Sequence, residues 1–385
     1  MILRRLLLGA GLLLVAVLLV ALLHSGAVGR LRWDGARVGP YTFLPGGQQG
    51  GGPQPPPAGG DAAKDFSPLS TLVENSVASV PLQGASLLLI RDGRVVYQQA
   101  FGNYTLDTAV PIASGTKWLT AATIMALVDD GLLALDAPIA RYLPGLDGDQ
   151  ARITMRQLLS GTSGLPNLSP CFDESSGTLA QCAGEIVHSP LVAAPGTAFC
   201  YSTAGFQVAG WLAEAVTGKP WATLFEEQLK LPLGMWSTTY GATANPVLGG
   251  GVTSTLRDYG RFLQMLLDGG VFQGQRVLSA AAVREMERDQ TDDLPILLSM
   301  HQDGRRYGLG AWRDMVDAQG NAIQLSSQGD TGFSPWIDRQ RHLCGVFLTE
   351  DELGNVYGLV AQVQQAVRDI VDSSAAGTPP PGAGS

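Results

Sequence analysis

Ser114-Gly115-Thr116-Lys117 stands directly before an apolar segment, residues 118–133, that is predicted to be a helix. On a helix, positions three residues apart lie on one face about one turn apart, so Ser114 and Lys117 would be neighbours. The serine would lie at the positive end of the helix dipole, which favours developing negative charge. A lysine among apolar neighbours is desolvated, which lowers its pKa toward the range where it can accept a proton. The tetrapeptide therefore predicts a nucleophile with its own base.

The bulk properties of the 385 residues exclude some classes of function. A formal net charge of −9 and the lack of a basic run argue against nucleic-acid binding, because nothing would neutralise the phosphates. The four histidines are scattered, and no Cys-x-x-Cys or His-bearing metal spacing occurs, so neither a metal nor another cofactor is expected. A hydrophobic fraction of 45% is enough for a sizeable core.

An apolar run near the start of the sequence predicts a membrane segment. Arg4 and Arg5 precede 18 uncharged residues, 6–23. As a helix, this run would span roughly 27 Å, close to the hydrocarbon thickness of a bilayer. The charge asymmetry would keep the arginines in the cytoplasm and send the following chain across the membrane. Residues 1–24 are therefore expected to anchor the chain in the cell inner membrane, with the remainder in the periplasm or another extracytoplasmic space. A cleavable signal peptide is the alternative.

Composition divides the rest of the chain into three parts. Residues 25–65 contain a stretch, 46–60, made only of Gly, Gln, Pro and Ala, which is typical of a linker. Residues 66–372 carry the hydrophobic patterns of a folded domain. Residues 373–385 are mostly small residues and prolines and are expected to be disordered.

The four cysteines fit an oxidising compartment. Cys171 and Cys182 flank a short, mostly polar segment and are the best candidates for a disulfide. Cys200 and Cys344 either pair or remain buried thiols, and the sequence alone does not decide between these outcomes.

Strand-like segments lie at both ends of the folded domain. Residues 85–91 and 95–101 are joined by Asp92-Gly93-Arg94, which indicates a hairpin. Helical patterns dominate 116–294; strand-like runs return at 322–326, 335–338 and 343–349, before an amphipathic helix at 356–370. The simplest arrangement is an α+β fold: strands from both ends form one antiparallel sheet flanked by helices, and the mainly helical middle is an inserted domain. The functional site is expected in the groove between them.

Several short motifs follow one another in a characteristic order. They are Ser114-x-x-Lys117, then Tyr201-Ser202-Thr203 after Pro195-Gly196-Thr197, then Ser327-Gln328-Gly329, with linking segments at 131–136, 142–144, 153–165, 232–235 and 250–255. In this order they resemble the serine β-lactamase-like superfamily, which includes class C β-lactamases, DD-peptidases, and related esterases and amide hydrolases. The resemblance covers about residues 84–364 and implies a β-lactamase/transpeptidase-like fold.

The resemblance implies covalent acyl transfer. Ser114 would attack a carbonyl carbon while Lys117 and Tyr201 share the proton as a coupled pair, in which a nearby ammonium favours the phenolate. The backbone N–H groups of Ser114 and Asp330 would form the oxyanion hole. The substrate would contact Thr203, Ser327 and Gly329.

Two positions depart from the family pattern. Thr203 stands where the second motif has Asn, so a hydroxyl of shorter reach replaces an amide that contacts substrate. Ser327 stands where the third motif has Lys or His, a cation that helps hold the carboxylate of penicillins and D-alanyl peptides. Ser327 would offer one neutral hydrogen bond, about half the strength of a charge-assisted one. The sequence therefore predicts an ester or amide substrate without a carboxylate at that subsite, and little β-lactamase activity.

The resulting hypothesis is a membrane-anchored, extracytoplasmic serine hydrolase that cleaves a small-molecule ester or amide. One alternative is a DD-peptidase that acts on cell-wall peptides, which agrees with the expected location but not with Ser327. The other is a catalytically silent relative that binds a ligand through the same site. The intact Ser114, Lys117 and Tyr201 favour an enzyme, whereas the changed third motif favours the silent relative.

Overall fold

The computed structural model describes residues 64–373, except 81, 175 and 176. The predicted anchor at 1–24, nearly all of the predicted linker and nearly all of the predicted tail lie outside these residues, so the domain boundaries stay predictions. Within the described ranges, no helix is both long enough and apolar enough to cross a membrane.

A seven-stranded antiparallel sheet has the order β2-β1-β13-β12-β11-β10-β9. Its strands are β1 (Gly84–Arg91), β2 (Arg94–Gly102), β9 (Arg306–Tyr307), β10 (Trp312–Val316), β11 (Ala322–Ser326), β12 (Ser334–Asp338) and β13 (Leu343–Leu348). Strands from both ends of the domain therefore pair in one sheet, as the sequence predicts. The sequence did not predict β9 and β10, which extend the sheet beyond β11.

The first hairpin forms where the sequence indicates. Asp92 and Gly93 have φ values of 50° and 72°, the positive values that a tight type I′ turn requires. Beyond this hairpin, β1 pairs with β13 from Ser86↔Leu348 to Arg91↔Leu343. This pairing brings the two ends of the domain together.

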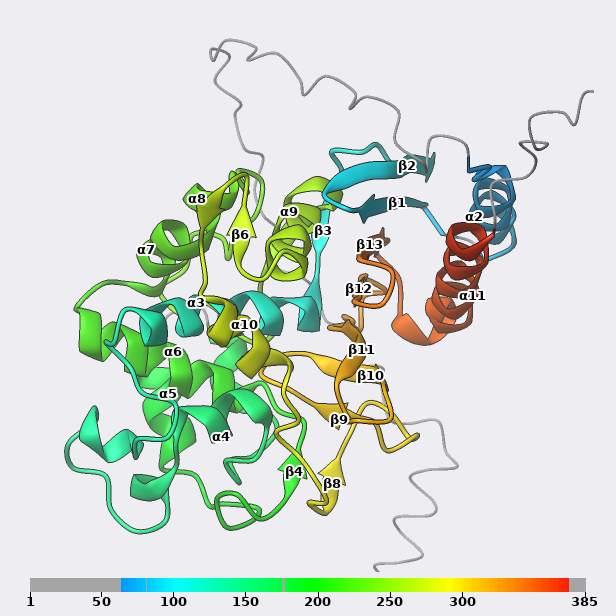
Figure 1. The fold of residues 1–385 in the computed structure, drawn as a ribbon. Helices are drawn as coiled ribbons and strands as arrows, with labels where there is room; N and C mark the ends of the chain where they lie inside the picture. The colour runs from blue at the N-terminus through cyan, green and yellow to red at the C-terminus, as the bar shows by residue number, and fades with distance from the viewer. Residues whose placement is uncertain (1–63, 81, 175–176, 374–385) are drawn as a thin grey trace, which may run out of the picture. The chain divides into compact units, whose positions relative to one another are not determined.

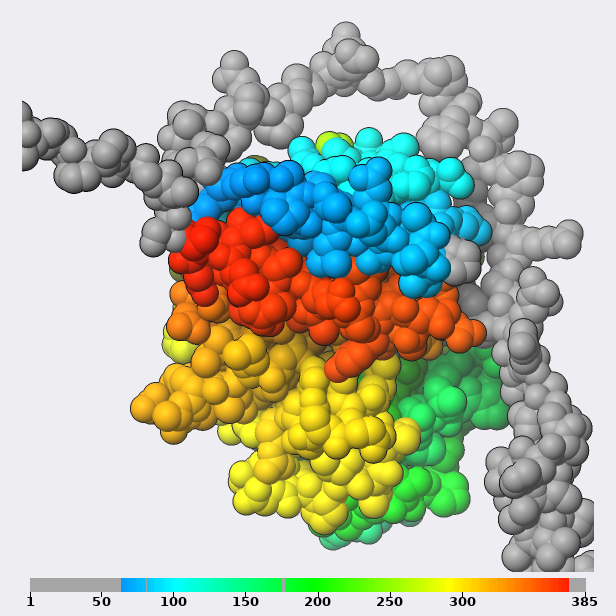
Figure 2. Space-filling model, turned by 90° about the vertical axis from the view of Figure 1, so that its right-hand side faces the viewer, coloured from blue at the N-terminus to red at the C-terminus, as the bar shows by residue number. Residues whose placement is uncertain are grey.

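Helices α2 (Ser67–Ser79) and α11 (Leu353–Asp372) pack together on one face of the sheet (Figures 1 and 2). Side chains alternate along β1: Leu87 and Leu89 join the cluster under these two helices, whereas Leu88 and Ile90 join the main core on the opposite face. Residues 356–370 were predicted as a helix, but α2 was not predicted.

The segment between β2 and β9 is mainly helical and builds most of the main core. Its α-helices are α3 (Thr116–Asp129), α4 (Met155–Ser160), α5 (Leu179–Val187), α6 (Ala204–Thr217), α7 (Trp221–Phe225), α8 (Leu231–Leu233), α9 (Leu256–Leu267) and α10 (Ala280–Glu287). Shorter turns are η2 (Ala113–Gly115), η3 (Ile139–Arg141), η4 (Gln150–Arg152), η5 (Pro170–Asp173) and the π-helical η6 (Glu226–Lys230). Short strands pair as β3 (Ala109–Pro111) with β5 (Thr253–Thr255), β4 (Phe199–Cys200) with β8 (Ile296–Leu298), and β6 (Val271–Phe272) with β7 (Gln275–Arg276).

Helix α3 is buried on all sides from Thr116 to Leu127. A helix without a solvent face has to bury its polar residues as well as its apolar ones. The chain therefore places the amine of Lys117 inside the molecule.

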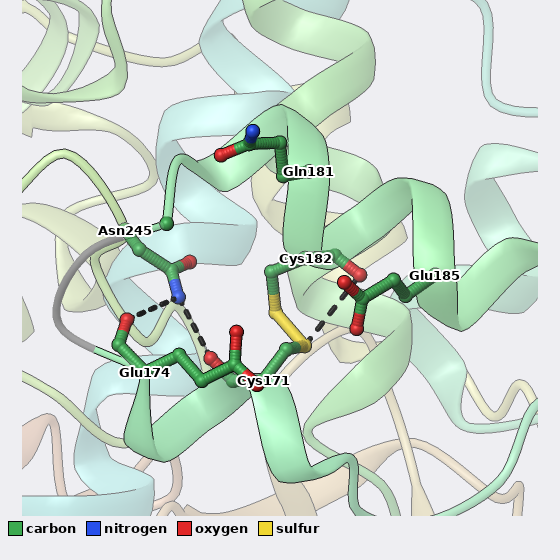
Figure 3. A pocket seen from close by; sticks show the side chains of 7 residues that line it. Cys171, Glu174, Gln181, Cys182, Glu185 and Asn245 are labelled. Atoms are coloured by element: carbon green, nitrogen blue, oxygen red, sulfur yellow. Dashed lines mark hydrogen bonds between the residues drawn. A yellow bond between two sulfur atoms is a disulfide. The ribbon is translucent and has the colours of Figure 1, made fainter.

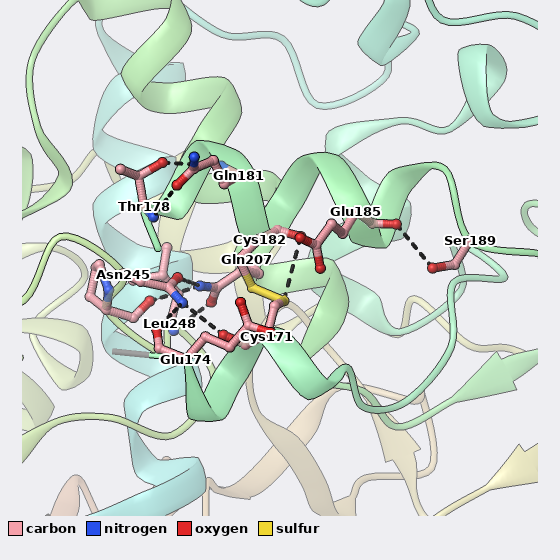
Figure 4. The surroundings of a disulfide bond; sticks show 11 residues. Cys171, Glu174, Thr178, Gln181, Cys182, Glu185, Ser189, Gln207, Asn245 and Leu248 are labelled. Carbon is pink, nitrogen blue, oxygen red and sulfur yellow. Dashed lines mark hydrogen bonds between the residues drawn. A yellow bond between two sulfur atoms is a disulfide. The ribbon is translucent and has the colours of Figure 1, made fainter. Parts of the chain in front are cut away.

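A disulfide joins η5 to α5. Cys171 and Cys182 are bonded, with a Cα–Cα distance of 5.3 Å (Figure 4). Cys200 and Cys344 are buried free thiols. Beside the bridge lies a cavity of about 240 Å³ whose lining includes Glu174 (Figure 3). None of the predicted catalytic residues lines this cavity.

Hydrogen bonds lead from the disulfide to the segment that follows Asn245 (Figure 4). The Asn245 side chain donates to the Cys171 carbonyl at 2.8 Å and accepts from Gln207 at 2.9 Å. Gln207 in turn accepts from the Leu248 N–H at 3.0 Å. The cross-linked loop is thus tied to the backbone just before Gly249.

Candidate active site

Ser114 lies in the tight turn η2, directly before α3. Ala113 has a φ of 42°, a left-handed conformation that costs free energy for a residue other than glycine and is common at functional sites. The Tyr259 hydroxyl donates to the Gly115 carbonyl at 2.7 Å and so braces the turn. Ser114 itself is half-buried. It therefore lies at the N-terminal end of the helix, as the sequence predicts.

Lys117 is 1% exposed and makes three hydrogen bonds through its amine. Its Nζ atom donates to Ser114 Oγ at 3.1 Å, to Thr203 Oγ1 at 3.3 Å and to the Gly249 carbonyl at 2.7 Å. Burial lowers the pKa of Lys117 to about 7, although the negative charge of Asp330 opposes this effect. An amine with this pKa is about half unprotonated at neutral pH and can accept the Ser114 proton directly.

Tyr201 packs between Lys117 and an aromatic wall. The Lys117 amine lies over its ring, 4.7 Å from the centroid, and the ring stacks on Trp312 at 5.1 Å. Burial raises the pKa of Tyr201 above its ordinary value, and a hydrogen-bonding interaction with the Ser114 side chain offsets only part of the rise. The expected lysine-stabilised phenolate is therefore not favoured. The lowered pKa of Lys117 and the raised pKa of Tyr201 favour Lys117 as the base, with Tyr201 kept as a protonated hydroxyl.

The loop after β11 is fastened to the segment that carries the nucleophile. Thr331 Oγ1 donates to the Pro111 carbonyl at 2.8 Å, and Ser327 Oγ donates to the Ser114 carbonyl at 3.1 Å. Within the described residues, neither the Ser114 N–H nor the Asp330 N–H has a hydrogen-bond acceptor. Both predicted oxyanion-hole donors thus remain available to a substrate oxygen.

Ser327 differs from its predicted role. It is 2% exposed, and its hydroxyl donates to the Ser114 and Gly310 carbonyls at 3.1 and 3.0 Å. A hydroxyl has one proton, which these two acceptors share, so none is left for a substrate. Ser327 was predicted to donate to the substrate. Instead, it braces the backbone of the nucleophile.

Gly329 acts through its lack of a side chain. A Cβ atom at this position would lie 2.4 Å from the Ile112 carbonyl oxygen, closer than atoms can approach. Glycine therefore lets the loop after β11 pass against the segment that precedes Ser114.

Thr203 was predicted to contact the substrate, but its hydroxyl accepts a hydrogen bond from Lys117. A Cβ atom on Gly249 would lie 2.7 Å from Thr203 Cγ2, so these two residues touch. Sequence reasoning missed Gly249, because a backbone carbonyl that accepts from Lys117 leaves no mark on residue type. The one available signal was the glycine run at 249–251.

The chain is similar to known proteins in both sequence and fold. The β-lactamase family model matches residues 69–367, which is most of the chain. The chain belongs to the β-lactamase family. Its membership confirms the resemblance found from the motifs.

Individual relatives of this β-lactamase-family protein carry different names. Esterase EstB of Burkholderia gladioli is 31% identical over 202 residues, which cover 46% of this chain and 51% of EstB. The D-alanyl-D-alanine-carboxypeptidase/endopeptidase AmpH of Escherichia coli K12 is 28% identical over 259 residues, or 59% of this chain and 66% of AmpH. A crystal structure from Bacteroides dorei DSM 17855, classed with the β-lactamases, is 33% identical with a TM-score of 0.74, covering 80% of this chain and all of that one. The match thus spans only about half of EstB.

The pH dependence of Ser114 reactivity tests the assignment of the base. In this β-lactamase-family protein, labelling of Ser114 by a fluorophosphonate is expected to slow about tenfold per pH unit below pH 7, because protonated Lys117 cannot accept a proton. Above about pH 7 the rate should level off. Lys117→Arg keeps a cation that does not deprotonate and should label slowly at every pH. A wild-type rate that stays constant from pH 5 to 9 would contradict the assignment.

The Gly249 carbonyl offers a second test with a matched control. Gly249→Ala pushes a methyl group against Thr203, so the carbonyl that holds Lys117 has to move. We expect kcat/KM to fall about 10- to 100-fold, the usual effect of a displacement near 1 Å. At Gly250, a Cβ atom meets nothing within 4 Å, so Gly250→Ala should retain wild-type kcat/KM. Equal activities of the two folded variants would show that the position of this carbonyl does not matter.

Proposed function

We propose that this chain is a serine hydrolase that cleaves an ester, or a related amide, through an acyl-enzyme on Ser114. The observation that carries the proposal is the contact of 3.1 Å between Lys117 Nζ and Ser114 Oγ, made by a buried amine whose pKa is about 7. A protein that only binds a ligand has no need of a nucleophile paired with a base. Similarity to EstB supports ester cleavage in particular.

In the proposed reaction, unprotonated Lys117 takes the Ser114 proton while Ser114 Oγ bonds to the carbonyl carbon of the substrate. The carbonyl oxygen becomes an oxyanion that accepts hydrogen bonds from the N–H groups of Ser114 and Asp330. The proton on Lys117 then passes through the Tyr201 hydroxyl to the leaving alcohol or amine as its bond to carbon breaks. Water attacks the acyl-enzyme, gives its proton to Lys117, and releases an acid; Lys117 returns this proton to Ser114 Oγ.

The charges around the site favour a substrate without a carboxylate beside the third motif. Ser327 replaces the family cation, and its proton is already engaged. Arg339 donates to the carbonyls of residues 266 and 267 and pairs with a glutamate on α10. Arg341 pairs with Asp338 and Asp372. Neither arginine is therefore held ready for a substrate carboxylate.

We also propose that the hydrolase works outside the cytoplasm, tethered by residues 1–24. The apolar run at 6–23 and the disulfide both support this location.

Fractionation of cells that express the full chain tests the location. The protein is expected in the membrane fraction, with two of its four cysteines resistant to alkylation after unfolding without reductant, because Cys171 and Cys182 are bonded. A soluble protein with four reactive thiols would contradict both the anchor and the oxidising compartment.

Substrate comparison tests the activity. We expect the full chain to hydrolyse p-nitrophenyl acetate with a kcat/KM at least about 100-fold above that for benzylpenicillin, because an uncompensated substrate carboxylate costs several kcal/mol. Ser114→Ala should abolish both hydrolysis and fluorophosphonate labelling without lowering the melting temperature, since Ser114 is half-buried and not core.

The other outcomes separate the alternatives. Preferential cleavage of a D-alanyl-D-alanine peptide would replace the esterase with a DD-peptidase. Absence of both labelling and turnover in the folded wild type would support a silent ligand-binding relative.

A further inference from the structure

Two segments with exposed apolar side chains flank the residues of the second motif. On one side, the Tyr201 N–H donates to the Leu298 carbonyl at 3.0 Å, which fixes β8 beside β4 (Figure 1). On the other side, the Thr203 N–H donates to the Asn167 carbonyl at 3.2 Å, directly before Leu168. Both segments are thus positioned by the backbone that carries the catalytic tyrosine.

The exposure of these side chains is unusual. Ile296, Leu297 and Leu298 are 45%, 52% and 40% exposed, and Leu168 is 66% exposed. Successive side chains of a strand point to opposite faces, so a strand normally buries at least one set. Strand β8 buries neither. Singly exposed apolar residues need no explanation, but three in a row on a strand bonded to the Tyr201 backbone indicate a binding surface.

The wall next to β8 is also apolar. Tyr201, Tyr307 and Trp312 form a buried aromatic cluster with Phe199, and Met300 packs against it. His301 meets the Trp312 ring edge-on at 4.6 Å. Burial and the charge of Arg305 lower the pKa of His301 to about 4, so it carries no charge at neutral pH. These residues are themselves buried, so the apolar surface offered to a ligand is that of β8 and Leu168.

The role of Tyr201 decides which part of a substrate would meet this surface. In the proposed reaction the tyrosine hydroxyl delivers the proton to the leaving group, so the leaving oxygen has to lie next to that hydroxyl. The alcohol carbons continue outward from the leaving oxygen. Leu168 and β8 are exposed apolar segments bonded to the backbone of this motif, so they are the surface that these carbons would meet.

We infer that Leu168 and β8 bind the alkyl chain of the leaving alcohol, so that the preferred substrates are esters of apolar alcohols. This inference rests on the proposed ester hydrolysis and names its substrate class. Each methylene moved from water into apolar contact contributes about 0.8 kcal/mol, which is about fourfold in kcat/KM when burial is complete. On a partly open surface, about twofold per methylene is expected.

A series of straight-chain alkyl acetates tests the inference with the full-length protein. Ethyl, butyl and hexyl acetate share the acyl group and have leaving alcohols of similar basicity, so differences in kcat/KM report contacts of the chain. We expect kcat/KM to rise about twofold per methylene. In Ile296→Ser and Leu298→Ser, whose side chains share one face of β8, this rise should flatten, with ethyl acetate little changed. Leu132→Ser serves as the matched control, because Leu132 is 44% exposed and lies outside these segments.

The outcomes separate this inference from the proposed function. In one outcome, the wild-type protein hydrolyses ethyl acetate and Ser114 reacts with a fluorophosphonate, but kcat/KM does not depend on alcohol length. That result would overturn the inference and leave the proposed hydrolase intact. A length dependence that survives Ile296→Ser and Leu298→Ser, or that shifts equally in Leu132→Ser, would also overturn it. If those variants instead flatten a p-nitrophenyl ester series of increasing acyl length, the surface binds the acyl chain and the assignment to the alcohol is wrong. With neither labelling nor turnover, both proposals fail together.

Discussion

The burial of the Lys117 amine is the constraint on which the rest of the site depends. An ammonium inside a protein is costly unless acceptors surround it, and a buried lysine responds by losing its proton more easily. Because α3 has no solvent face, the acceptors have to come from other segments, and the Gly249 carbonyl at 2.7 Å is the nearest of them. That carbonyl reaches Lys117 only because residue 249 lacks a side chain against Thr203. The hydrogen bonds through Gln207 and Asn245 then tie this segment to the disulfide loop.

Ser327 changes the electrostatics of the site relative to the family pattern. A lysine or protonated histidine at this position would place a second cation near Lys117, and like charges in a low-dielectric site lower each other's pKa. Among the residues that the structure describes, Asp330 is the acidic group that acts on Lys117, and it raises the pKa that burial lowers. The pKa of Lys117 therefore stays close to neutral pH without the influence of a second cation. The same replacement lets the third motif brace the Ser114 carbonyl, a role that a charged side chain would fill less well because it would have to be desolvated there.

The sequence predicts those features whose signals are local. The Asp92-Gly93 turn, the spacing of Ser114 and Lys117 and the short separation of Cys171 from Cys182 each lie within a dozen residues, and the structure contains all of them. Features that depend on distant packing were not predicted. Strand β9 has two residues and α2 a weak hydrophobic pattern, so neither stands out from its surroundings. The two acceptors of Ser327 and the high pKa of Tyr201 arise from segments that meet only in the fold.

Under the proposed function, no family cation binds the substrate beside the third motif, so the substrate needs another source of binding free energy. Apolar contact beside Tyr201 would supply it, but such contact is weakly selective, because one methylene changes kcat/KM only about fourfold even when its burial is complete. An open surface such as β8 discriminates less. The carbonyl of the substrate would therefore decide which bond is cleaved, because two N–H groups and Ser114 fix its position. The alkyl part of the substrate would tolerate variation. The chemistry of this site is thus held rigidly by polar contacts around Lys117, and its substrate range is left to a surface that imposes few directional demands.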